Sequence, residues 1–523
     1  MSNIASLTEE FREDLAEFRE MTDKFYTKQI SSKEYKGFSG GFGSYAQKGG
    51  EAGMLRLRMP GGRLTKEKLR FVVDTIEKYG LHRAHFTTCQ TIQLHDLTSE
   101  QICSIIEEAL DAGIITRGGG GDFPRNVMVS PLSGVETGEY FDVLPYAEAV
   151  SDYLLGKIKT VKMPRKLKVG FSNSPANVTH ATFRDLGFVA ASDGTFDVYS
   201  AGGLGNNPKM GVKITEHVDP SEVLYYVEAM VRTFLAYGNY ESRAKARTRY
   251  MQDTLGGADG YRRAYLEKLE EVKSEKAGEL DLHFSVGKEP EAYRITKTGD
   301  GSSVEDRRVL SQKQEGLYTI VYHPIGGVPA VSKFAELYRT IKEMDAVELR
   351  LAPDESIYVI NLTGDESKKV LDVTNDGAQN LFETSVSCIG ATVCQIGLRD
   401  SQGLLAKIIA EVRKHDFADG VLPQIHISGC TSSCGTHQIG RLGFHGGVKR
   451  VDGKAEPAFT FHVNGSDVQG EERFGEPWGV MLEKDIPAFF VELGETVQAA
   501  GLTYDAWYEQ NPEALRKLAG KYL

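Results

Sequence analysis

Four cysteines in the C-terminal third of the chain have the type and spacing of metal ligands. Cys388 and Cys394 form a Cys-x5-Cys pair, and Cys430 and Cys434 form a Cys-x3-Cys pair after a further 35 residues. Four thiolates are what a [4Fe–4S] cluster requires, because each iron takes one sulfur ligand from the protein. A zinc site more often uses Cys-x2-Cys pairs or histidine partners, and four unrelated buried cysteines are the remaining alternative. The chain has only six cysteines in 523 residues, so their clustering favours the iron–sulfur interpretation.

Cationic side chains in three segments suggest a second kind of chemistry. They are Arg56, Arg58, Arg125, Lys166 and Lys168. Alternation within 54–59 and within 165–169 puts the cations on one face of an expected strand and apolar residues on the other. Such charges are ordinarily solvated surface. Gathered in one cleft they would repel unless an anion held them, and an oxyanion would form charge-assisted hydrogen bonds of about 1.5–3 kcal/mol each. Repulsion would also lower the lysine pKa values, which makes lysine a better proton donor.

The elements that must position these residues occur twice in the sequence. Residues 59–97 and 324–362 align without a gap at an offset of 265, which places a Pro-Gly-Gly on an Ile-Gly-Gly. Both copies continue with the apolar stripe of a half-buried helix and then with an alternating strand. Duplication is therefore favoured over two unrelated α+β units.

A second repeat is expected downstream of each copy. Residues 163–170 resemble residues 422–429, and a Leu-Gly-Phe follows each. On this alignment, Phe171 and Pro175 stand where the second copy carries Cys430 and Cys434. One half is therefore expected to hold metal and the other half cationic side chains.

Composition limits the classes of function. The chain is 41% hydrophobic and 26% charged, as in a soluble globular protein of two to four domains. Its formal net charge of −12 argues against nucleic acid as the main partner. No apolar run is long enough for a membrane span, and the first residues lack a basic, apolar leader. Few cysteines and no disulfide framework predict a reducing compartment, the cytoplasm.

Taken together, the cysteine quartet and the Arg-x-Arg-x-Pro-Gly-Gly segment resemble the sirohaem-dependent sulfite and nitrite reductase family over nearly the whole chain. The resemblance implies an α+β fold with pseudo-twofold duplication: two ferredoxin-like half-domains and two larger α/β lobes that hold sirohaem and the iron–sulfur cluster. The expected segments are an N-terminal helix and arm over 1–50, half-domain 1 over 51–120, a substrate-binding cationic lobe with a linker over 121–300, half-domain 2 over 301–380, and a [4Fe–4S] and sirohaem lobe over 381–523.

The resemblance also assigns site residues. The four cysteines would bind the cluster, and Cys434 would in addition bridge one cluster iron to the sirohaem iron. The cations expected around sulfite or nitrite are Arg56, Arg125, Lys166 and Lys168. The side chains expected near the macrocycle are Arg58, Gln93, His95 and Asn126. Cys89 departs from the family pattern, because many members carry an arginine there that contacts a sirohaem carboxylate.

The family reduces sulfite to sulfide or nitrite to ammonia with six electrons. Nitrite-selective plant-type members tend to have Asn where this chain has Lys168, and an added positive charge favours dianionic sulfite. We therefore expect a sulfite reductase that also reduces nitrite. Gly203-Leu204-Gly205 lacks the full dinucleotide motif, and no ferredoxin-type Cys run is present. An external ferredoxin is the expected electron donor, with a flavoprotein subunit second. A cobalamin-pathway monooxygenase relative and a non-catalytic Fe–S electron-transfer or sensor protein are the alternatives.

Overall fold

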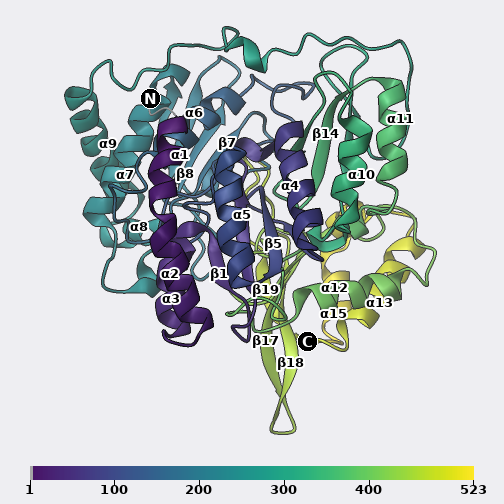
Figure 1. The fold of residues 1–523 in the computed structure, drawn as a ribbon. Helices are drawn as coiled ribbons and strands as arrows, with labels where there is room; N and C mark the ends of the chain where they lie inside the picture. The colour runs from purple at the N-terminus through teal and green to yellow at the C-terminus, as the bar shows by residue number, and fades with distance from the viewer. Residues whose placement is uncertain (1–3) are drawn as a thin grey trace. The chain divides into compact units, whose positions relative to one another are not determined.

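The computed structural model describes residues 4–523 (Figure 1). Residues 1–3 of the expected N-terminal segment lie outside the described part. The chain divides into two compact units. The first unit comprises 1–203, 208–322 and 330–375, and the second comprises 204–207, 323–329 and 376–523. This division is coarser than the five expected segments, whose bounds remain predictions.

The N-terminal segment and the first half-domain belong to the first unit. The segment contains α1 (Ile4–Glu13), α2 (Leu15–Tyr26) and α3 (Ser32–Ser39). The half-domain contains β1 (Ser44–Ala46), β2 (Gly53–Arg58), β3 (Arg63–Leu64), α4 (Lys66–Tyr79), β4 (Ala84–Phe86), β5 (Thr91–Leu97) and α5 (Ser99–Asp111). Four of its strands form an antiparallel sheet in the order β1-β2-β5-β4.

The second half-domain repeats this order of elements. It contains β11 (Val309–Ser311), β12 (Tyr318–Tyr322), α10 (Ser332–Ile341), β13 (Glu348–Leu351), β14 (Ile357–Leu362) and α11 (Gly364–Val373). The sheet order is β11-β12-β14-β13-β3, so the central β12-β14-β13 matches β2-β5-β4.

Backbone details match at the offset of 265 residues that the sequence predicts. Gly61 and Gly326 occupy matching positions in the glycine turns, and both have φ of 60°, a left-handed conformation that glycine adopts without steric cost. Thr98 and Thr363 also match, and each begins a helix with a capping box. The correspondence therefore extends beyond the aligned residues.

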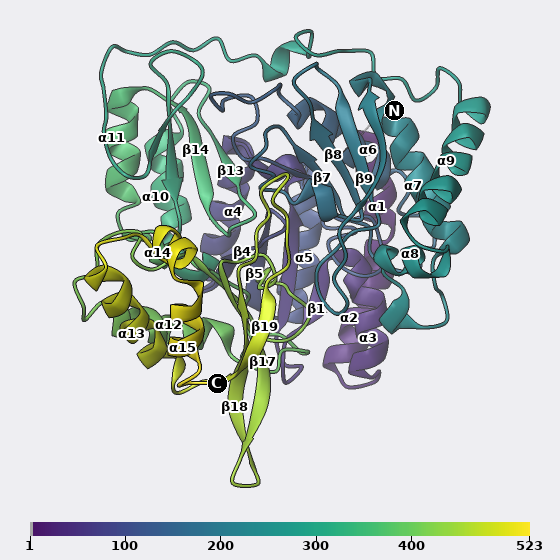
Figure 2. The ribbon, with the colours of Figure 1, turned by 180° about the vertical axis from the view of Figure 1, so that it is seen from behind.

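The two larger lobes share one sheet topology. The first lobe contains β6 (Met128–Val129), α6 (Leu144–Leu155), β7 (Val169–Ser172), β8 (Leu186–Ala190), β9 (Phe196–Ser200), β10 (Val212–Val218), α7 (Val223–Tyr237), α8 (Met251–Thr254) and α9 (Ala258–Glu275). The second lobe contains β15 (Val386–Ser387), α12 (Ser401–Val412), β16 (Ile425–Ser428), β17 (Leu442–Val451), β18 (Lys454–Val463), β19 (Glu476–Leu482), α13 (Ile486–Ala499), α14 (Tyr504–Gln510) and α15 (Pro512–Ala519). The orders are β6-β7-β8-β9-β10 and β15-β16-β17-β18-β19, in each case with three parallel strands followed by two antiparallel ones. Figure 2 labels β7, β8 and β9 of the first lobe and β17, β18 and β19 of the second.

The strand registers correct the alignment expected for the second repeat. Val169 pairs with Leu186 in the first lobe, and Ile425 pairs with Leu442 in the second. Val169 therefore corresponds to Ile425, an offset of 256, and the expected alignment was displaced by three residues. The error came from matching one glycine to another, whereas the register is fixed by backbone hydrogen bonds.

This correction changes which residues of the first lobe correspond to the cysteines of the second lobe. Ser174 and Val178, and not Phe171 and Pro175, correspond to the cysteines of the Cys-x3-Cys pair. Residues with left-handed backbone confirm the offset of 256, and they are Asn177 and His180 in the first lobe and Ser433 and Thr436 in the second. Within residues 4–523, no helix has the length and apolar character needed to cross a membrane.

Candidate functional site

The polar face of the first half-domain sheet carries several of the predicted site residues. Arg56 on β2 pairs with Gln93 on β5, which pairs in turn with His85 on β4. Directly opposed residues point to the same side of a sheet, so the three side chains form a row. The apolar residues predicted for one face, Leu55, Leu57 and Met59, are fully buried, and Arg56 on the other face is half-buried, but Arg58 is buried as well.

A glycine-rich loop brings Arg56 and Arg125 together. Both guanidinium groups donate to the carbonyl oxygen of Gly119, Arg125 over 2.9 Å. Arg125 also donates to the carbonyl oxygen of Gly121 over 2.8 Å. Burial, and to a lesser degree the charge of Arg56, lowers the pKa of Arg125 to about 10, although Tyr45 opposes the shift. Two like charges are thus held beside one backbone acceptor.

The segment that carries the predicted lysines is hydrogen-bonded through its backbone to the segment that carries Arg125. Pro124 and Leu167 form a parallel bridge, and the Arg125 amide donates to the Leu167 carbonyl over 2.8 Å. Lys166 and Lys168 flank Leu167, which is fully buried. The alternation predicted for this segment therefore holds, and the structure brings the lysines alongside Arg125.

Lys168 contacts Cys89. Its Nζ lies 3.2 Å from the Cys89 Sγ. Burial raises the pKa of the Cys89 thiol, but Lys168, Arg184 and Arg56 together outweigh it and lower this pKa to about 6. Burial lowers the pKa of Lys168, and Arg184 and Arg247 add to that effect while Cys89 opposes it. The expected direction of the lysine shift is confirmed, with burial rather than repulsion as its main cause.

Sequence reasoning missed two cations in this neighbourhood. The Arg184 guanidinium donates to the Thr179 carbonyl over 2.7 Å. Arg247 forms an ion pair of 3.0 Å with Asp185, and Asp185 also accepts the Lys168 backbone amide. Neither arginine lies in an alternating strand segment, so the pattern that indicated the other cations was absent.

Arg58 and Asn126 hold loops in place. Arg58 is 2% exposed and donates to the carbonyl oxygens of Arg117 and Arg125 over 2.8 and 3.0 Å. Asn126 donates to the carbonyl oxygens of Met59, Cys89 and Gln90. Burial lowers the pKa of Arg58 to about 9. These contacts position the segments that carry Arg125 and Cys89, and the predicted contact with a macrocycle remains a prediction.

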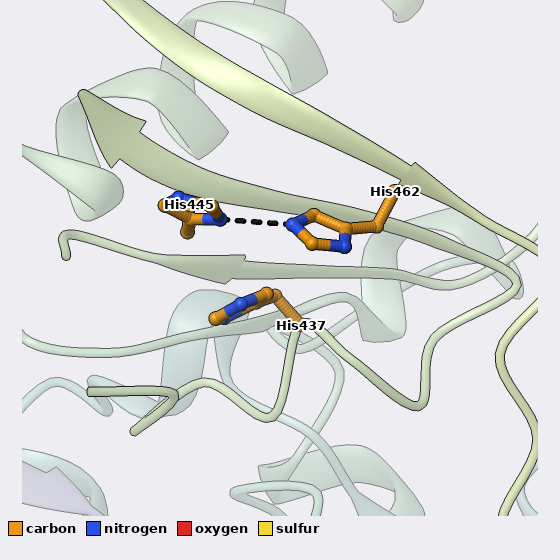
Figure 3. Close-up of side chains that lie close together, drawn as sticks. All are labelled: His437, His445 and His462. Carbon is orange, nitrogen blue, oxygen red and sulfur yellow. Dashed lines mark hydrogen bonds between the residues drawn. The ribbon is translucent and has the colours of Figure 1, made fainter. Parts of the chain in front are cut away.

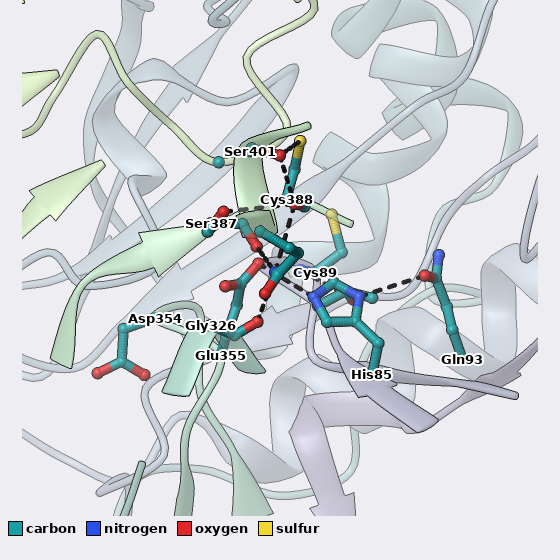
Figure 4. Close-up of polar contacts among 12 residues, drawn as sticks. His85, Cys89, Gln93, Gly326, Asp354, Glu355, Ser387, Cys388 and Ser401 are labelled. Atoms are coloured by element: carbon teal, nitrogen blue, oxygen red, sulfur yellow. Dashed lines mark hydrogen bonds and ion pairs between the residues drawn. The ribbon is translucent and has the colours of Figure 1, made fainter. Parts of the chain in front are cut away.

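Gln93 and His95 are buried and have protein partners. The Gln93 Oε1 lies 3.3 Å from His85 Nδ1, and His85 Nε2 lies 3.6 Å from the Glu355 carboxylate (Figure 4). His95 Nδ1 lies 3.3 Å from the Gln47 Oε1. Burial lowers the pKa of His95 well below its usual value, which keeps the ring neutral. A role of either side chain beside a cofactor remains a prediction.

Several buried polar atoms of this cluster have no hydrogen-bond partner among residues 4–523. They are the Nε atoms of Arg56, Arg58 and Arg125, the Nε2 of His95 and the Oδ1 of Asn126. Buried donors without partners are costly, and unsatisfied guanidinium donors fit an anionic group such as a substrate oxyanion or a carboxylate. The three guanidinium groups therefore fit the anionic ligands that the sequence predicts. Asn126 Oδ1 is an acceptor, and so is His95 Nε2, because His95 Nδ1 faces the Gln47 Oε1.

The predicted cysteine ligands come from two loops at one edge of the second-lobe sheet. Cys388 follows β15 and Cys430 follows β16, and these strands are parallel neighbours. Carboxyl ends of parallel strands meet at the same edge, where ligands commonly bind. Cys394 closes the first loop, and its amide donates to the Gly390 carbonyl over 2.9 Å.

Contacts between the loops hold the Cys388 thiol, and Cys434 lies close enough to act on it electrostatically. The Gly429 amide donates to the Cys388 Sγ over 3.1 Å, and the Ser401 Oγ lies 3.2 Å from that sulfur (Figure 4). Burial, followed by the nearby Cys434, raises the pKa of Cys388 to about 12. The six cysteines, all within residues 4–523, form no disulfide. This set of sulfur donors, one of which accepts a backbone N–H, fits a [4Fe–4S] cluster.

Comparisons with known proteins agree with this chemistry. The model of the nitrite and sulphite reductase 4Fe-4S domain matches residues 120–273, and the model of the nitrite/sulfite reductase ferredoxin-like half domain matches residues 45–112. The 4Fe-4S match thus falls on the first lobe, whose topology the cysteine-bearing lobe shares.

Curated relatives and a solved structure match most of the chain. A ferredoxin–nitrite reductase of Leptolyngbya laminosa is 25% identical, over 83% of this chain and 83% of that protein. A chloroplastic ferredoxin–nitrite reductase of Zea mays is 27% identical, over 79% and 73%. The assimilatory ferredoxin-dependent nitrite reductase of Haloferax mediterranei is 25% identical, over 91% and 85%. The structure of the Mycobacterium tuberculosis NirA protein has the same fold, with a TM-score of 0.73 and 21% identity over 90% and 89% of the two chains. The chain therefore belongs to the nitrite and sulfite reductase family and is an oxidoreductase of that family.

Proposed function

We propose that this protein reduces sulfite to sulfide with six electrons, at a sirohaem coupled to a [4Fe–4S] cluster. The observation that carries the proposal is Lys168, which lies with Arg56 and Arg125 in one partly buried cationic cluster. Three positive charges around one anion favour a dianion over a monoanion, because the Coulomb energy scales with the product of charges. Sulfite carries one more negative charge than nitrite.

The cysteines Cys388, Cys394, Cys430 and Cys434 would hold the cluster, and Cys434 would also bridge it to the sirohaem iron. When bound, the two groups supply electrons one at a time. Ile396 and Leu398, in the cysteine loop, are 54% and 59% exposed. Apolar side chains of this size at a protein surface support a macrocycle as their covering.

The cations of the first unit would bind the anion and supply protons. Arg56 and Arg125 are held by Gly119 and would orient substrate oxygens through charge-assisted hydrogen bonds. Lys168 has a lowered pKa and would therefore give up its Nζ proton more readily to a departing oxygen. Lys166 would add positive charge beside it. Arg58 and Asn126 would fix the loops, and with Gln93 and His95 they would contact the macrocycle.

The repeat at an offset of 265 residues supports a second ferredoxin-like half-domain and a pseudo-twofold arrangement. The names of the relatives support an external ferredoxin as electron donor, with a flavoprotein subunit second. The absence of disulfides among residues 4–523 supports a reducing compartment such as the cytoplasm.

Nitrite reduction to ammonia at the same site is the second candidate, because the named relatives are nitrite reductases. The test is a visible absorption spectrum of the purified enzyme, followed by paired sulfite and nitrite assays with a chemical reductant. Sirohaem bands, sulfide production and a higher kcat/KM for sulfite are expected. A far higher kcat/KM for nitrite would overturn the substrate assignment. Absence of sulfide production would favour the cobalamin-pathway alternative, and absence of sirohaem bands would favour a non-catalytic Fe–S electron-transfer or sensor protein.

A further inference from the structure

Three histidines of the second lobe gather on one face of its sheet. Gly443 on β17 pairs with His462 on β18, and His445 lies two residues beyond Gly443 on the same face. The loop after β16 crosses above, since a Cβ at Gly443 would stand 1.9 Å from the His437 carbonyl oxygen. The strand register and a glycine contact therefore place His437, His445 and His462 together (Figure 3).

The three rings form a compact triangle. Ring centroids lie 4.9 Å apart for His437 with His445, 4.9 Å for His437 with His462, and 5.1 Å for His445 with His462. One ring nitrogen from each residue lies within 4.8 Å of the other two. His437 and His462 are buried, whereas His445 is partly exposed and leaves an approach from solvent.

Partners of the remaining ring nitrogens orient two of the histidines. His462 Nδ1 lies 3.2 Å from the Gly475 carbonyl oxygen, which can only accept, so Nδ1 carries the proton and Nε2 has a lone pair. That lone pair faces His445 Nδ1 at 2.9 Å. His437 Nδ1 lies 3.0 Å from the Ser428 Oγ, which leaves its Nε2 available. Metal-binding histidines are oriented in this way by their second nitrogen.

We propose that His437, His445 and His462 bind one divalent transition-metal ion, with zinc as the representative ion. Imidazole nitrogens suit this class of metal, and three protein ligands leave a fourth tetrahedral position open. Ligands about 2.0–2.1 Å from zinc stand about 3.3 Å apart. The His445–His462 pair needs to open slightly, with His445 in its other neutral tautomer, and His437 needs to move inward.

The site would be separate from the iron–sulfur cluster and close to it in sequence. His437 lies three residues after Cys434, and its partner Ser428 lies two residues before Cys430. A metal on the triad would therefore fix both ends of the loop that carries these cysteines. The first lobe has Ala181, Val189 and Tyr199 at the corresponding positions, so only the second copy offers this set of ligands.

The test measures zinc on the full-length holoenzyme. Protein is treated with a chelator, dialysed against zinc, and analysed for zinc and iron by mass spectrometry and for zinc by K-edge X-ray absorption. One zinc per chain with a coordination shell of three imidazoles is expected. His445→Gln and His462→Gln should weaken zinc binding by more than about 100-fold, beyond the typical loss for a partner outside the first coordination shell.

A matched control is His415→Gln, which removes a partly exposed histidine of the same unit that stacks on Phe417. This variant should keep the zinc. Iron content and the sirohaem spectrum are read on the same samples, so failure of the proposed function is distinguishable from failure of this proposal. Wild-type protein without zinc, a zinc spectrum dominated by sulfur, or equal binding by the triad variants would each overturn the proposal and leave a hydrogen-bonded cluster of neutral histidines.

Discussion

The two lobes share one sheet topology and differ in their side-chain donor atoms. Strand order, strand direction and two left-handed residues match between them. The cysteine positions of the second lobe correspond, by strand register, to residues of the first that cannot bind iron. For Cys388, Cys430 and Cys434 these residues are Ser130, Ser174 and Val178. The histidine positions correspond to Ala181, Val189 and Tyr199.

This difference separates what the fold requires from what the chemistry requires. A Cβ on Gly187 would stand 1.8 Å from the Ala181 carbonyl oxygen, and one on Gly443 would stand 1.9 Å from the His437 carbonyl oxygen. Both copies keep the glycine because the crossing loop leaves no room. Side chains that point away from this crossing are not restricted in the same way, so one lobe can carry cysteines and histidines where the other has serine, alanine, valine and tyrosine.

The largest expected effect is the loss of the cluster. Cys430→Ala removes one of the four thiolates, and an Fe–S cluster needs all four. We expect loss of iron and of sulfite reduction in this variant. Ser174→Ala, at the matching position of the first lobe, should keep both. Equal effects of the two variants on iron content would show that the lobes are not specialised as described.

The next largest effect is a loss of folding stability, which should be equal in the two lobes. Gly187→Ala and Gly443→Ala both force a Cβ against a backbone carbonyl that cannot move independently. Overpacking of this kind costs about 3 kcal/mol. Urea unfolding should show both variants destabilised by a similar amount, whereas Gly447→Ala is the milder control, since the nearest atom to the added Cβ lies 4.0 Å away. A stable Gly187→Ala variant would contradict the shared crossing.

A smaller effect, on substrate preference, is expected from the positive charge of Lys168, which the second lobe lacks at the corresponding position. Lys168 corresponds to the uncharged Gln424 of the second lobe at the offset of 256. Lys168→Asn should shift the ratio of kcat/KM for sulfite over nitrite toward nitrite by about tenfold, or about 1.4 kcal/mol. Lys162→Asn removes an exposed lysine nearby and should leave the ratio unchanged. An unchanged ratio in Lys168→Asn would contradict the Coulomb argument for sulfite.

The smallest effect concerns Cys89, whose counterpart at an offset of 265 is Asp354. The pKa of Cys89 is lowered to about 6, so the thiolate predominates at pH 7. Only the thiolate is alkylated, and the alkylation rate of Cys89 should rise with pH to half its maximum near pH 6. Lys168→Met removes a lowering charge, which should raise the midpoint and slow alkylation at pH 7 several-fold. Mass spectrometry of the Cys89 peptide measures the rate, and a midpoint that stays near pH 6 would contradict the described pair.

Part of this architecture could be predicted from the sequence. The repeat at an offset of 265 was found because helix and strand periodicity coincide with a glycine turn that needs φ of 60°. The second repeat was misaligned by three residues because its strands are short and its glycines are not equivalent. Register depends on hydrogen bonds to neighbouring strands, and those partners are distant in the sequence.

The candidate site could be predicted where a local sequence pattern indicated its residues. Arg56 and Lys168 alternate with buried apolar residues, and the cysteines occur in short spaced pairs. Arg184 and Arg247 reach the same neighbourhood from segments without such a pattern. The histidine triad was also missed, because residues on a loop and two strands meet only through the pairing of Gly443 with His462.

The single carbonyl of Gly119 has a consequence for the direction of turnover. Because Arg56 and Arg125 both donate to it, this carbonyl holds the two guanidinium groups near each other without an anion between them. The repulsion between the two guanidinium groups is therefore present in the folded protein before any anion binds. Under the proposed function, a dianion bound between them would relieve this repulsion most, and a neutral product would relieve none of it. One peptide group would thereby favour binding of a charged oxyanion over an uncharged product.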